Sequence, residues 1–472
     1  MAVLFEIKEK VGKELLKEIR EDEWKGEGYC KEMYSKYGSR LPFRRSDFEH
    51  FKKDELIDII HCMVEWVHIN RENLYKVEKI NERDLSNLLN TQIEMCYDEF
   101  DKALKTNGVG LSFINYFIKE KLLSVTVKGN GSNTVMDILD DYKKVYKVVI
   151  KTIQLVKTGI ITLNSILNTS RLVGTQTVSN FRPLSSAYIM YKYGILKNKD
   201  KNELNFWIPS EGWLGRMLSS YYIAYNNPDK QINYISTDPS GDVVSSFWEA
   251  VEWLKDYGGI SKVKNWHPEI RQHGSEVEEA RFKVREDKMF DLIWTSPPYS
   301  LGYEMYKDSY RITAVDSKGK KVKIKDKNDN YLSEMYTMDD GKRVKEINCG
   351  DKFVYCGEEY TLFSKRSLGQ SHSKAITNNG WNEIFFRPTV RNCLENLYDS
   401  GTMIWNVANV RSHMTLEDDV KRICDEEGFT LIDTIKYSLS RVPGEAVVDG
   451  KKVSIKEYKP NYEPVFIFEK KK

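Results

Sequence analysis

The spacing of hydrophobic residues changes along the chain. Over the first 170 residues, apolar side chains recur every three or four positions, as between Leu56 and Val67, which is the spacing of one helix face. This spacing predicts helices over 48–70 and 74–104, and another from Met136 onward, after a loop rich in Gly and Asn. We therefore expect a helical N-terminal domain over residues 1–170.

Short apolar runs that end in Gly, Pro, Asp or Ser begin at about residue 171. Two helical stretches, 243–257 and 381–399, lie between these runs, and Pro388 predicts a kink or boundary inside the second. Strands that alternate with helices indicate βαβ units and a mainly parallel sheet, so the predicted fold class is α/β. The strand-like runs occupy 232–237, 290–295 and 401–410, with a last strand over 463–470.

A stretch of different texture interrupts this alternation between residues 307 and 366. Polar and apolar residues alternate there around Ser317-Lys318-Gly319 and around Asp340-Gly341, and Asp-Gly between such runs is a strong hairpin signal. We expect a β-rich insertion over 307–366, which divides the α/β core into 171–306 and 367–472. A further hairpin is predicted over 445–458.

The composition is that of an ordinary globular chain. Hydrophobic residues make up 40% and charged residues 30%, which excludes a largely disordered chain and a multi-span membrane protein. The 72 basic and 70 acidic side chains leave a formal charge of +2, so nucleic-acid binding would need local patches. The most apolar stretch, 148–167, contains Lys151, Lys157 and Gly159 and is too polar to span a membrane.

The cysteines indicate neither a disulfide scaffold nor a metal site. There are seven, without a Cys-x-x-Cys pair, and Cys349 and Cys356 with His372 have poor spacing for zinc. We therefore expect no metal. Residues 1–22 carry charges too early for a signal peptide, and the expected location is a reducing, cytoplasmic compartment.

The segment richest in chemistry is Thr295-Ser296-Pro297-Pro298-Tyr299, directly after a strand-like run. Two prolines fix φ and remove two backbone donors, which leaves carbonyl groups free to accept hydrogen bonds from a ligand. The Ser296 hydroxyl and the Pro297 carbonyl can hold an exocyclic amino group while the Tyr299 ring stacks on the heterocycle. In α/β sheets ligands bind at the carboxyl ends of strands, where this segment falls.

This segment resembles motif IV, (D/N/S)PP(Y/F), of S-adenosylmethionine-dependent amino methyltransferases that act on DNA bases. The upstream stretch 206–225 resembles motif I in the form D-P-x-x-G-W-x-G-R found in phage-like members, with Ile208 in place of the Asp and Leu214 in place of a frequent Gly. The order of the motifs along the chain, X, I and IV, also resembles that family. The matching positions of motif I are Pro209, Gly212, Trp213, Gly215 and Arg216.

Three shorter segments resemble the family in the same order. Asp238 is similar to the motif II acid that accepts from the ribose hydroxyls of the cofactor, 274–276 falls where a motif III loop approaches the adenine, and 179–183 resembles motif X. The resemblance implies a Rossmann-like class I methyltransferase sheet and S-adenosylmethionine as cofactor. The cofactor-binding residues that it implies are Phe181, Pro209, Gly212, Trp213, Gly215, Asp238, Glu276 and Thr295.

The implied reaction is methyl transfer to an exocyclic base amine of double-stranded DNA. The base must be flipped out of the duplex, and the residues at the reacting amine would be Ser296, Pro297, Pro298 and Tyr299. Because Ser is commoner at this position in cytosine-N4 enzymes, we place cytosine-N4 slightly ahead of adenine-N6. A cytosine-C5 enzyme is excluded, since none of the cysteines follows a proline.

Two other interpretations stay open. With Ile208 in motif I, the domain could be a non-catalytic, DNA-binding relic of the same fold. An RNA or protein amine could also be the substrate, because the Ser-Pro-Pro-Tyr segment reads a flat amine and not a backbone.

The insertion carries a run of lysines beside its first predicted turn. Lys321, Lys323 and Lys325 alternate with apolar residues, so a strand would place them on one face. One interpretation is a solvated lysine row that protects a sheet edge. The other, which we favour, is a strand that contacts DNA phosphates and positions the duplex without reading its sequence.

Overall fold

A computed structural model describes most of the chain and divides it into two compact units. Unit 1 contains residues 1–78 and 119–178, and unit 2 contains 79–118 and 179–472. The domain boundaries expected at residues 170, 306 and 366 stay predictions. The described residues are 40–44, 53–105, 107–125, 134–155, 160–170, 172–173, 180–256, 263–281, 284, 288–298, 313–324, 338–339, 341–342, 347, 350–364, 380–410, 413–438, 445–448, 451–454 and 462–472.

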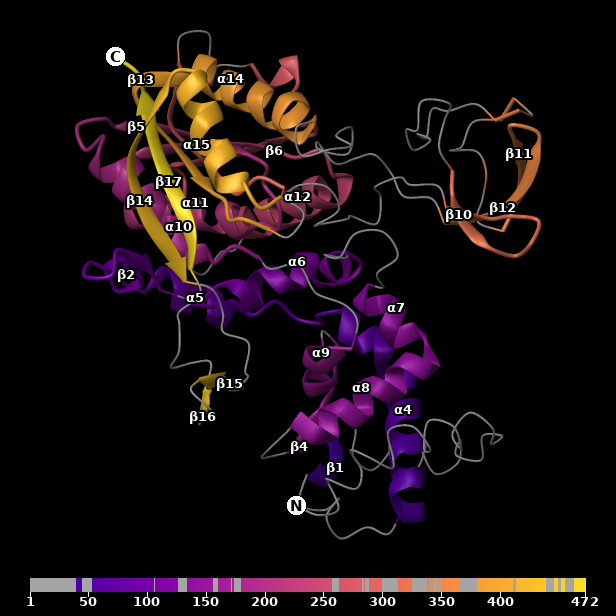
Figure 1. Cartoon of the computed structure of the whole chain (residues 1–472). Coiled ribbons are helices and arrows are strands. Elements are labelled where there is room, and N and C mark those ends of the chain that lie inside the picture. Colours follow the sequence, from indigo (N-terminus) through magenta and orange to yellow (C-terminus); the bar gives the residue numbers. More distant parts are fainter. Residues whose placement is uncertain are drawn as a thin grey trace. The chain divides into compact units, whose positions relative to one another are not determined.

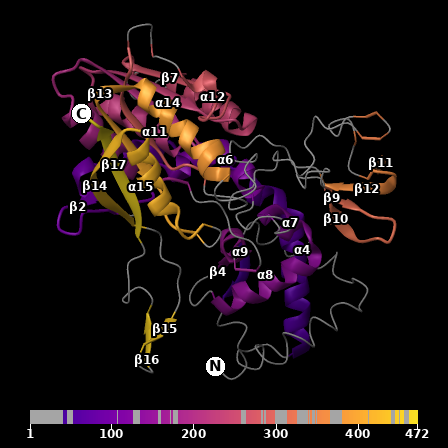
Figure 2. The ribbon, with the colours of Figure 1, turned by 45° about the horizontal axis from the view of Figure 1, so that its top comes forward.

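Unit 1 is helical around its own hydrophobic core, as Figure 2 shows for α4, α7, α8 and α9. A capping box begins α7, in which the Thr134 hydroxyl accepts from the Asp137 amide and the Asp137 carboxylate accepts from the Thr134 amide. The helix predicted from Met136 is confirmed, and so is the one predicted over 48–70 from residue 53 onward, since residues 48–52 lie outside the described residues. The elements of this unit are β1 (Arg40–Arg44), α4 (Lys53–Tyr75), α7 (Val135–Asp140), α8 (Tyr142–Leu155), β4 (Ile160–Thr162) and α9 (Leu163–Ser170).

The continuous helix predicted over 74–104 is wrong. The Asn81 side chain accepts from the Asp84 amide and begins a new, shorter helix, and the Asp98 carboxylate accepts from the Phe100 amide and forms a turn. These local side-chain contacts compete with a continuous helix. The segment contains α5 (Glu82–Leu89), a 3-10 turn (Ile93–Cys96), β2 (Tyr97–Asp98) and β3 (Ala103–Leu104), and α6 (Leu111–Leu123) follows.

Unit 2 is built on a nine-stranded sheet with the order β2-β3-β14-β17-β13-β8-β5-β6-β7. All of its strands run parallel except β2 and β17. The predicted strand-like runs are all strands of this sheet. Beyond β2 and β3, its strands are β5 (Glu203–Pro209), β6 (Gln231–Thr237), β7 (Trp266–Arg271), β8 (Phe290–Thr295), β13 (Leu397–Asn406), β14 (Phe429–Ser438) and β17 (Tyr462–Lys470).

The seven strands from β7 to β14 identify the fold. Numbered along the chain, they lie in the order 3-2-1-4-5-7-6 with the seventh reversed, which is the arrangement of a Rossmann-like class I methyltransferase sheet. The predicted α/β fold class is confirmed. The order reverses between β5 and β8, and ligands of open α/β sheets bind at such a point, outside the carboxyl ends of the strands.

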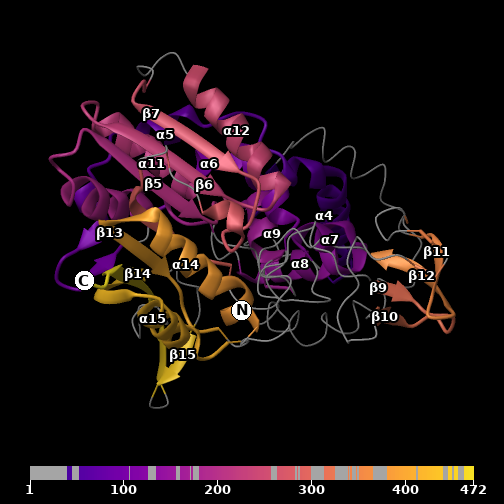
Figure 3. The same ribbon diagram turned by 90° about the horizontal axis from the view of Figure 1, so that it is seen from above.

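Helices cover both faces of this sheet, with α11 and α12 on one side and α14 and α15 on the other (Figure 3). Consecutive residues of β5 therefore both point into apolar surroundings. The Phe206 ring packs against Gly194 of the π-helical turn Met190–Leu196, and Trp207 belongs to the cluster that includes Trp381. The helices are α10 (Pro183–Ile189), α11 (Gly215–Asn226), α12 (Gly241–Asp256), α14 (Arg387–Asn396) and α15 (Leu416–Glu426).

The boundary expected near Pro388 is confirmed. A π-helical turn, Trp381–Phe386, changes there to the α-helix α14, whose first turn contains Pro388. Pro388 has no amide hydrogen to donate back to the preceding turn, which fits a change of helix type at this point.

The insertion contains a four-stranded antiparallel sheet in the order β10-β9-β12-β11, of which Figure 1 labels β10, β11 and β12. Ala314, Phe353 and Leu362 belong to a small buried core of its own, so the predicted β-rich insertion is confirmed. The hairpin predicted over 445–458 is formed by β15 and β16. The strands are β9 (Thr313–Val315), β10 (Lys321–Lys323), β11 (Lys352–Tyr355), β12 (Glu358–Ser364), β15 (Glu445–Val448) and β16 (Lys451–Ser454).

No helix in the described part of the chain is both long and apolar enough to cross a membrane.

Candidate active site

The loop between β5 and α11 has an unusual backbone. Ser210 and Leu214 have φ of 137° and 61°, although neither is a glycine, and Gly212 has φ of 65°. Such conformations cost free energy in L-residues and persist where surrounding contacts hold them, often at functional sites. The predicted motif I segment is therefore a strained turn at the carboxyl end of β5.

Glu211 lies inside this turn and is 1% exposed. Its carboxylate accepts from the Met217 amide at 3.2 Å and contacts the Tyr234 hydroxyl at 2.5 Å. Burial raises the pKa of Glu211 to about 7, opposed by the nearby charge of Arg216 and increased by that of Asp238. Sequence analysis did not identify Glu211, although a carboxylate between Ser210 and Gly212 after an apolar strand was a usable signal.

Arg216 supports the same turn from within the first turn of α11. Its Nη2 donates to the carbonyl oxygens of Ser210 at 2.6 Å and Glu211 at 3.1 Å. The side chain is 5% exposed, and among the described residues its Nε has no hydrogen-bond partner. The turn thus encloses a buried guanidinium group that retains an unused donor.

Asp238 faces the same turn from the end of β6. Its carboxylate accepts from the Gly212 amide and from the Ser240 amide, each at 3.0 Å. The structure therefore brings the predicted motif II acid to the predicted motif I loop.

The predicted motif X segment lies against the other side of the loop. The Asn180 side chain donates to the Trp213 carbonyl at 2.6 Å, and a Cβ on Gly215 would lie 2.1 Å from the Phe181 carbonyl oxygen. Gly215 is therefore required by close packing. Pro209, directly before the loop, is the last residue of β5.

The Phe181 ring is part of an aromatic group that sequence analysis missed. It stacks on Tyr437, with ring centroids 4.5 Å apart, and meets Trp294 edge to face at 5.1 Å. Tyr437 lies near the end of β14, and burial raises its pKa to about 12. No local pattern links residues 181 and 437, because only the sheet brings them together.

The predicted motif IV segment leaves β8 beside the loop. The Thr295 hydroxyl donates to the Ser210 carbonyl at 3.3 Å, and Thr295 is fully buried. Pro297 is buried, whereas Ser296 and Pro298 are half-buried. Tyr299 lies outside the described residues, so its stacking role stays a prediction.

Glu276 belongs to a loop that follows β7. Its carboxylate covers the Gly274 backbone, since a Cβ on Gly274 would lie 2.2 Å from Glu276 Oε2. The neighbouring Ser275 carbonyl accepts from Asn392 of α14 at 2.8 Å. This loop begins close to Asp238, whose amide donates to the Arg271 carbonyl at 3.1 Å.

The lysines proposed to contact DNA are described only in part. Lys321 and Lys323 lie in β10, which pairs with β9 and forms one edge of the insertion sheet. Lys325 lies outside the described residues. An edge position suits both interpretations of the lysines, so phosphate contact stays a prediction.

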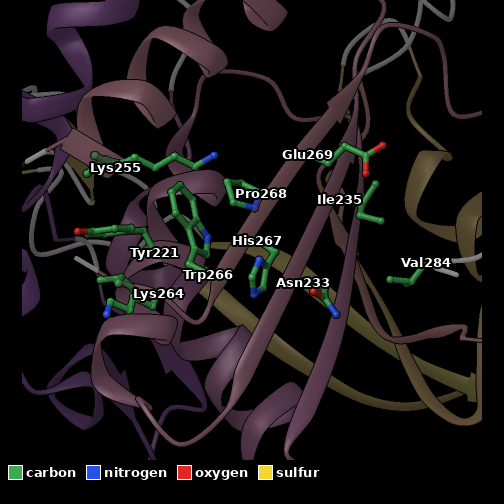
Figure 4. A pocket seen from close by; sticks show the side chains of 12 residues that line it. Tyr221, Asn233, Ile235, Lys255, Lys264, Trp266, His267, Pro268, Glu269 and Val284 are labelled. Carbon is green, nitrogen blue, oxygen red and sulfur yellow. The ribbon is translucent and has the colours of Figure 1, made fainter. Parts of the chain in front are cut away.

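A cavity of about 530 Å³ lies elsewhere in unit 2 (Figure 4). It is lined by Trp266 and His267 from the amino-terminal half of the edge strand β7, together with Lys255 and Lys264. None of the predicted site residues lines it. Separately, the described residues contain no group of three or more His, Cys, Asp or Glu side chains arranged to hold a metal ion.

No protein-family model matches the sequence, and no curated protein sequence matches it. Among solved structures, the chain is similar to a TehB-like SAM-dependent methyltransferase from Corynebacterium glutamicum, with 9% identity, TM-score 0.27, and coverage of 62% of this chain and 90% of that one. A S-adenosylmethionine-dependent methyltransferase from Clostridium acetobutylicum gives 8% identity, TM-score 0.28, and coverage of 61% and 91%.

A type I restriction-modification system methyltransferase subunit from Streptococcus thermophilus gives 12% identity, TM-score 0.26, and coverage of 100% of this chain and 85% of that one. These likenesses are too weak to establish a relationship. The fold assignment rests on the chain's own strand order, and the site on the contacts between its loops.

Proposed function

We propose that this chain is an S-adenosylmethionine-dependent DNA methyltransferase that modifies an exocyclic base amine, with cytosine-N4 slightly ahead of adenine-N6. One observation carries the proposal: the segments that resemble motifs X, I, II and IV meet at one edge of the sheet. Asn180 contacts Trp213, Asp238 contacts Gly212, and Thr295 contacts Ser210. This edge is where ligands of open α/β sheets bind, so the arrangement supports a single cofactor site built from these segments.

The residues at this edge fit the cofactor. A carboxylate such as that of Asp238 is an acceptor suited to ribose hydroxyls, and the amino end of α11 suits a carboxylate. Two buried polar atoms, Arg216 Nε and Thr237 Oγ1, have no hydrogen-bond partner among the described residues. Buried polar groups are normally paired, so a polar ligand at this loop would account for them.

The cofactor supplies an electrophilic methyl group on a sulfonium. The Ser296 hydroxyl and the Pro297 carbonyl would accept the two amine protons of the base, which favours a pyramidal nitrogen and directs its lone pair toward the methyl group. Positioning of this kind accounts for a large share of the barrier reduction in group transfer. Tyr299 would supply the stacking surface for a flipped base.

Transfer of a tritiated methyl group to unmodified DNA tests this function, with RNA of matched sequence as the control. Incorporation into DNA alone supports the proposal, whereas incorporation into RNA alone contradicts it. Mass spectrometry of the digested DNA then separates the two amines, and N6-methyladenine without N4-methylcytosine would overturn the preference for cytosine.

A non-catalytic relic is the second candidate, and Ile208 is the observation that favours it. The residue in the place of the family's Asp is fully buried in β5 and has no polar side-chain atom. Calorimetric titration with S-adenosylmethionine separates the two candidates: no binding at millimolar cofactor would favour the relic.

A further inference from the structure

We infer that Glu211 is the positioning residue of the cofactor loop and performs this task in place of the acid that Ile208 replaces. The inference deepens the proposed function and rests on it for the identity of the ligand. The Ile208 side chain cannot accept hydrogen bonds from the loop, since it is apolar and buried in β5; only the Ile208 carbonyl contributes, by accepting from the Ser210 amide at 2.9 Å. The loop therefore needs another acceptor.

Glu211 supplies that acceptor to two neighbouring elements. Leu214, the residue before α11, makes no side-chain cap, and the Glu211 carboxylate instead accepts from the Met217 amide in the first helical turn. Its other oxygen contacts the Tyr234 hydroxyl of β6. An acceptor at this point satisfies one of the unpaired amides of the helix and ties the helix to the sheet.

The backbone of Glu211 is held as firmly as its side chain. The Glu211 amide donates to the Thr237 carbonyl at 3.1 Å, and the Glu211 carbonyl accepts from Arg216. These contacts also fix the position of Gly212, whose amide donates to the Asp238 carboxylate. Glu211 thus connects the turn to Asp238, and the turn and Asp238 together form the candidate cofactor site.

Glu211 affects the charge of the candidate site as well as its shape. The charged or titratable groups that face it are Arg216 from α11, Tyr234 from β6 and Asp238 from the loop after β6. S-adenosylmethionine carries two cationic groups and one carboxylate, so its net charge favours an ionised Glu211. Binding should therefore release protons near neutral pH, in step with the raised pKa of this carboxyl.

Calorimetric titration of S-adenosylmethionine at pH 6 and pH 8 tests the inference in the wild type, Glu211→Gln and Glu211→Ala. Gln keeps an acceptor for the Met217 amide but carries no charge. Any dependence of affinity on pH that remains in the Glu211→Gln variant therefore measures the titration of the cofactor itself. We expect Glu211→Ala to weaken binding about tenfold or more at both pH values, because a buried amide loses its acceptor. Wild type and Glu211→Gln should bind alike, within about threefold, at pH 6, and the wild type should bind more tightly at pH 8.

Asp291→Asn is the matched control. Asp291 is also buried in the sheet, accepts from the Asn205 amide at 2.9 Å and pairs with Lys201, but it lies near the amino end of β8. Its variant should keep the wild-type dependence of cofactor affinity on pH. Equal affinities of Glu211→Ala and wild type, or equal pH profiles of Glu211→Gln and wild type, would overturn the inference.

Hydrogen exchange without cofactor separates this inference from the proposed function. The amides of residues 212–217 should exchange about tenfold faster in Glu211→Ala than in the wild type, while Glu211→Gln should restore protection. If neither the wild type nor any variant bound the cofactor, the proposed function would fail. The hydrogen-exchange rates would still test the positioning role of Glu211. Unchanged exchange in Glu211→Ala would contradict that role.

Discussion

Gly215, at the start of α11, and the turn glycines of the insertion occupy opposite surroundings. A Cβ on Gly215 would meet the Phe181 carbonyl oxygen at 2.1 Å, whereas a Cβ on Gly319 or Gly341 would meet nothing within 4 Å. The insertion glycines are needed only for their positive φ, 77° and 80°, at turns. Gly215 is thus required by its contact with a distant segment, whereas Gly319 and Gly341 are required by local backbone conformation, as Gly212 is with its φ of 65°.

Substitution of one glycine from each group should separate these causes most strongly. Gly215→Ala should displace the segment at Phe181, lower the free energy of unfolding by about 3 kcal/mol or more and abolish measurable cofactor binding. The added Cβ would meet backbone atoms of Phe181, which cannot move aside cheaply. Gly319→Ala should cost only about 1 kcal/mol. Urea unfolding and calorimetry measure both, and similar losses in the two variants would refute the distinction.

The pH dependence of stability should reveal the buried carboxyl of the loop. The folded-state pKa of Glu211 is about 7, above its ordinary value of 4.5, so folding favours the neutral acid. The contribution of Glu211 to the free energy of unfolding is complete below pH 4.5 and is lost as the pH rises through 7. Relative to Glu211→Gln, the wild type should lose about 3 kcal/mol between those limits and nothing further above them. Urea unfolding at a series of pH values checks this, and parallel curves would contradict it.

Asp238→Ala should weaken cofactor binding by about 1.5–3 kcal/mol, the range for a hydrogen bond to a charged group. Stability should fall as well, because the Gly212 and Ser240 amides lose their acceptor. Asp238→Asn, which keeps an acceptor oxygen, is the control for this second effect. Unchanged cofactor affinity in both variants would mean that Asp238 only shapes the loop.

The smallest effect is expected in the insertion. Replacing Lys321, Lys323 and Lys325 with Gln should weaken all DNA sequences alike and reduce the slope of log affinity against log salt by about one unit for each lost phosphate contact. Cofactor affinity should stay unchanged. A variant that binds DNA with the wild-type salt dependence would show the lysines to be a solvated sheet edge.

Local pattern predicted much of this fold because buried parallel strands are short, continuous apolar runs. The strands at 232–237 and 290–295 could be predicted from such runs. The hairpin turn at Gly319 could be predicted from a glycine between alternating polar and apolar residues. The helix predicted over 74–104 failed because polar residues such as Asn81 and Asp98 look alike on a helix surface and in a turn. Their side-chain contacts with nearby amides decide between the two.

The candidate site was predictable where a residue type is needed by its own backbone. Gly212 could be found, because a turn after a strand requires a positive φ. Glu211 offered a local signal, a carboxylate inside the turn, but its role depends on Tyr234, 23 residues away. Tyr437 could not be found, since its partner Phe181 lies 256 residues away. Contacts over such separations are set by the sheet and leave no local periodicity.

The position of β17 has a consequence for the order of assembly during synthesis. This strand comes last in sequence among those of the large sheet, yet it lies between β13 and β14. Until a ribosome has released residues 462–470, β14 has no neighbour on that side, and Tyr437 cannot be held against Phe181 by a completed sheet. We expect nascent chains that lack β17 to remain unable to retain cofactor and to depend on protection from aggregation, since an unpaired strand edge is exposed until synthesis reaches that point.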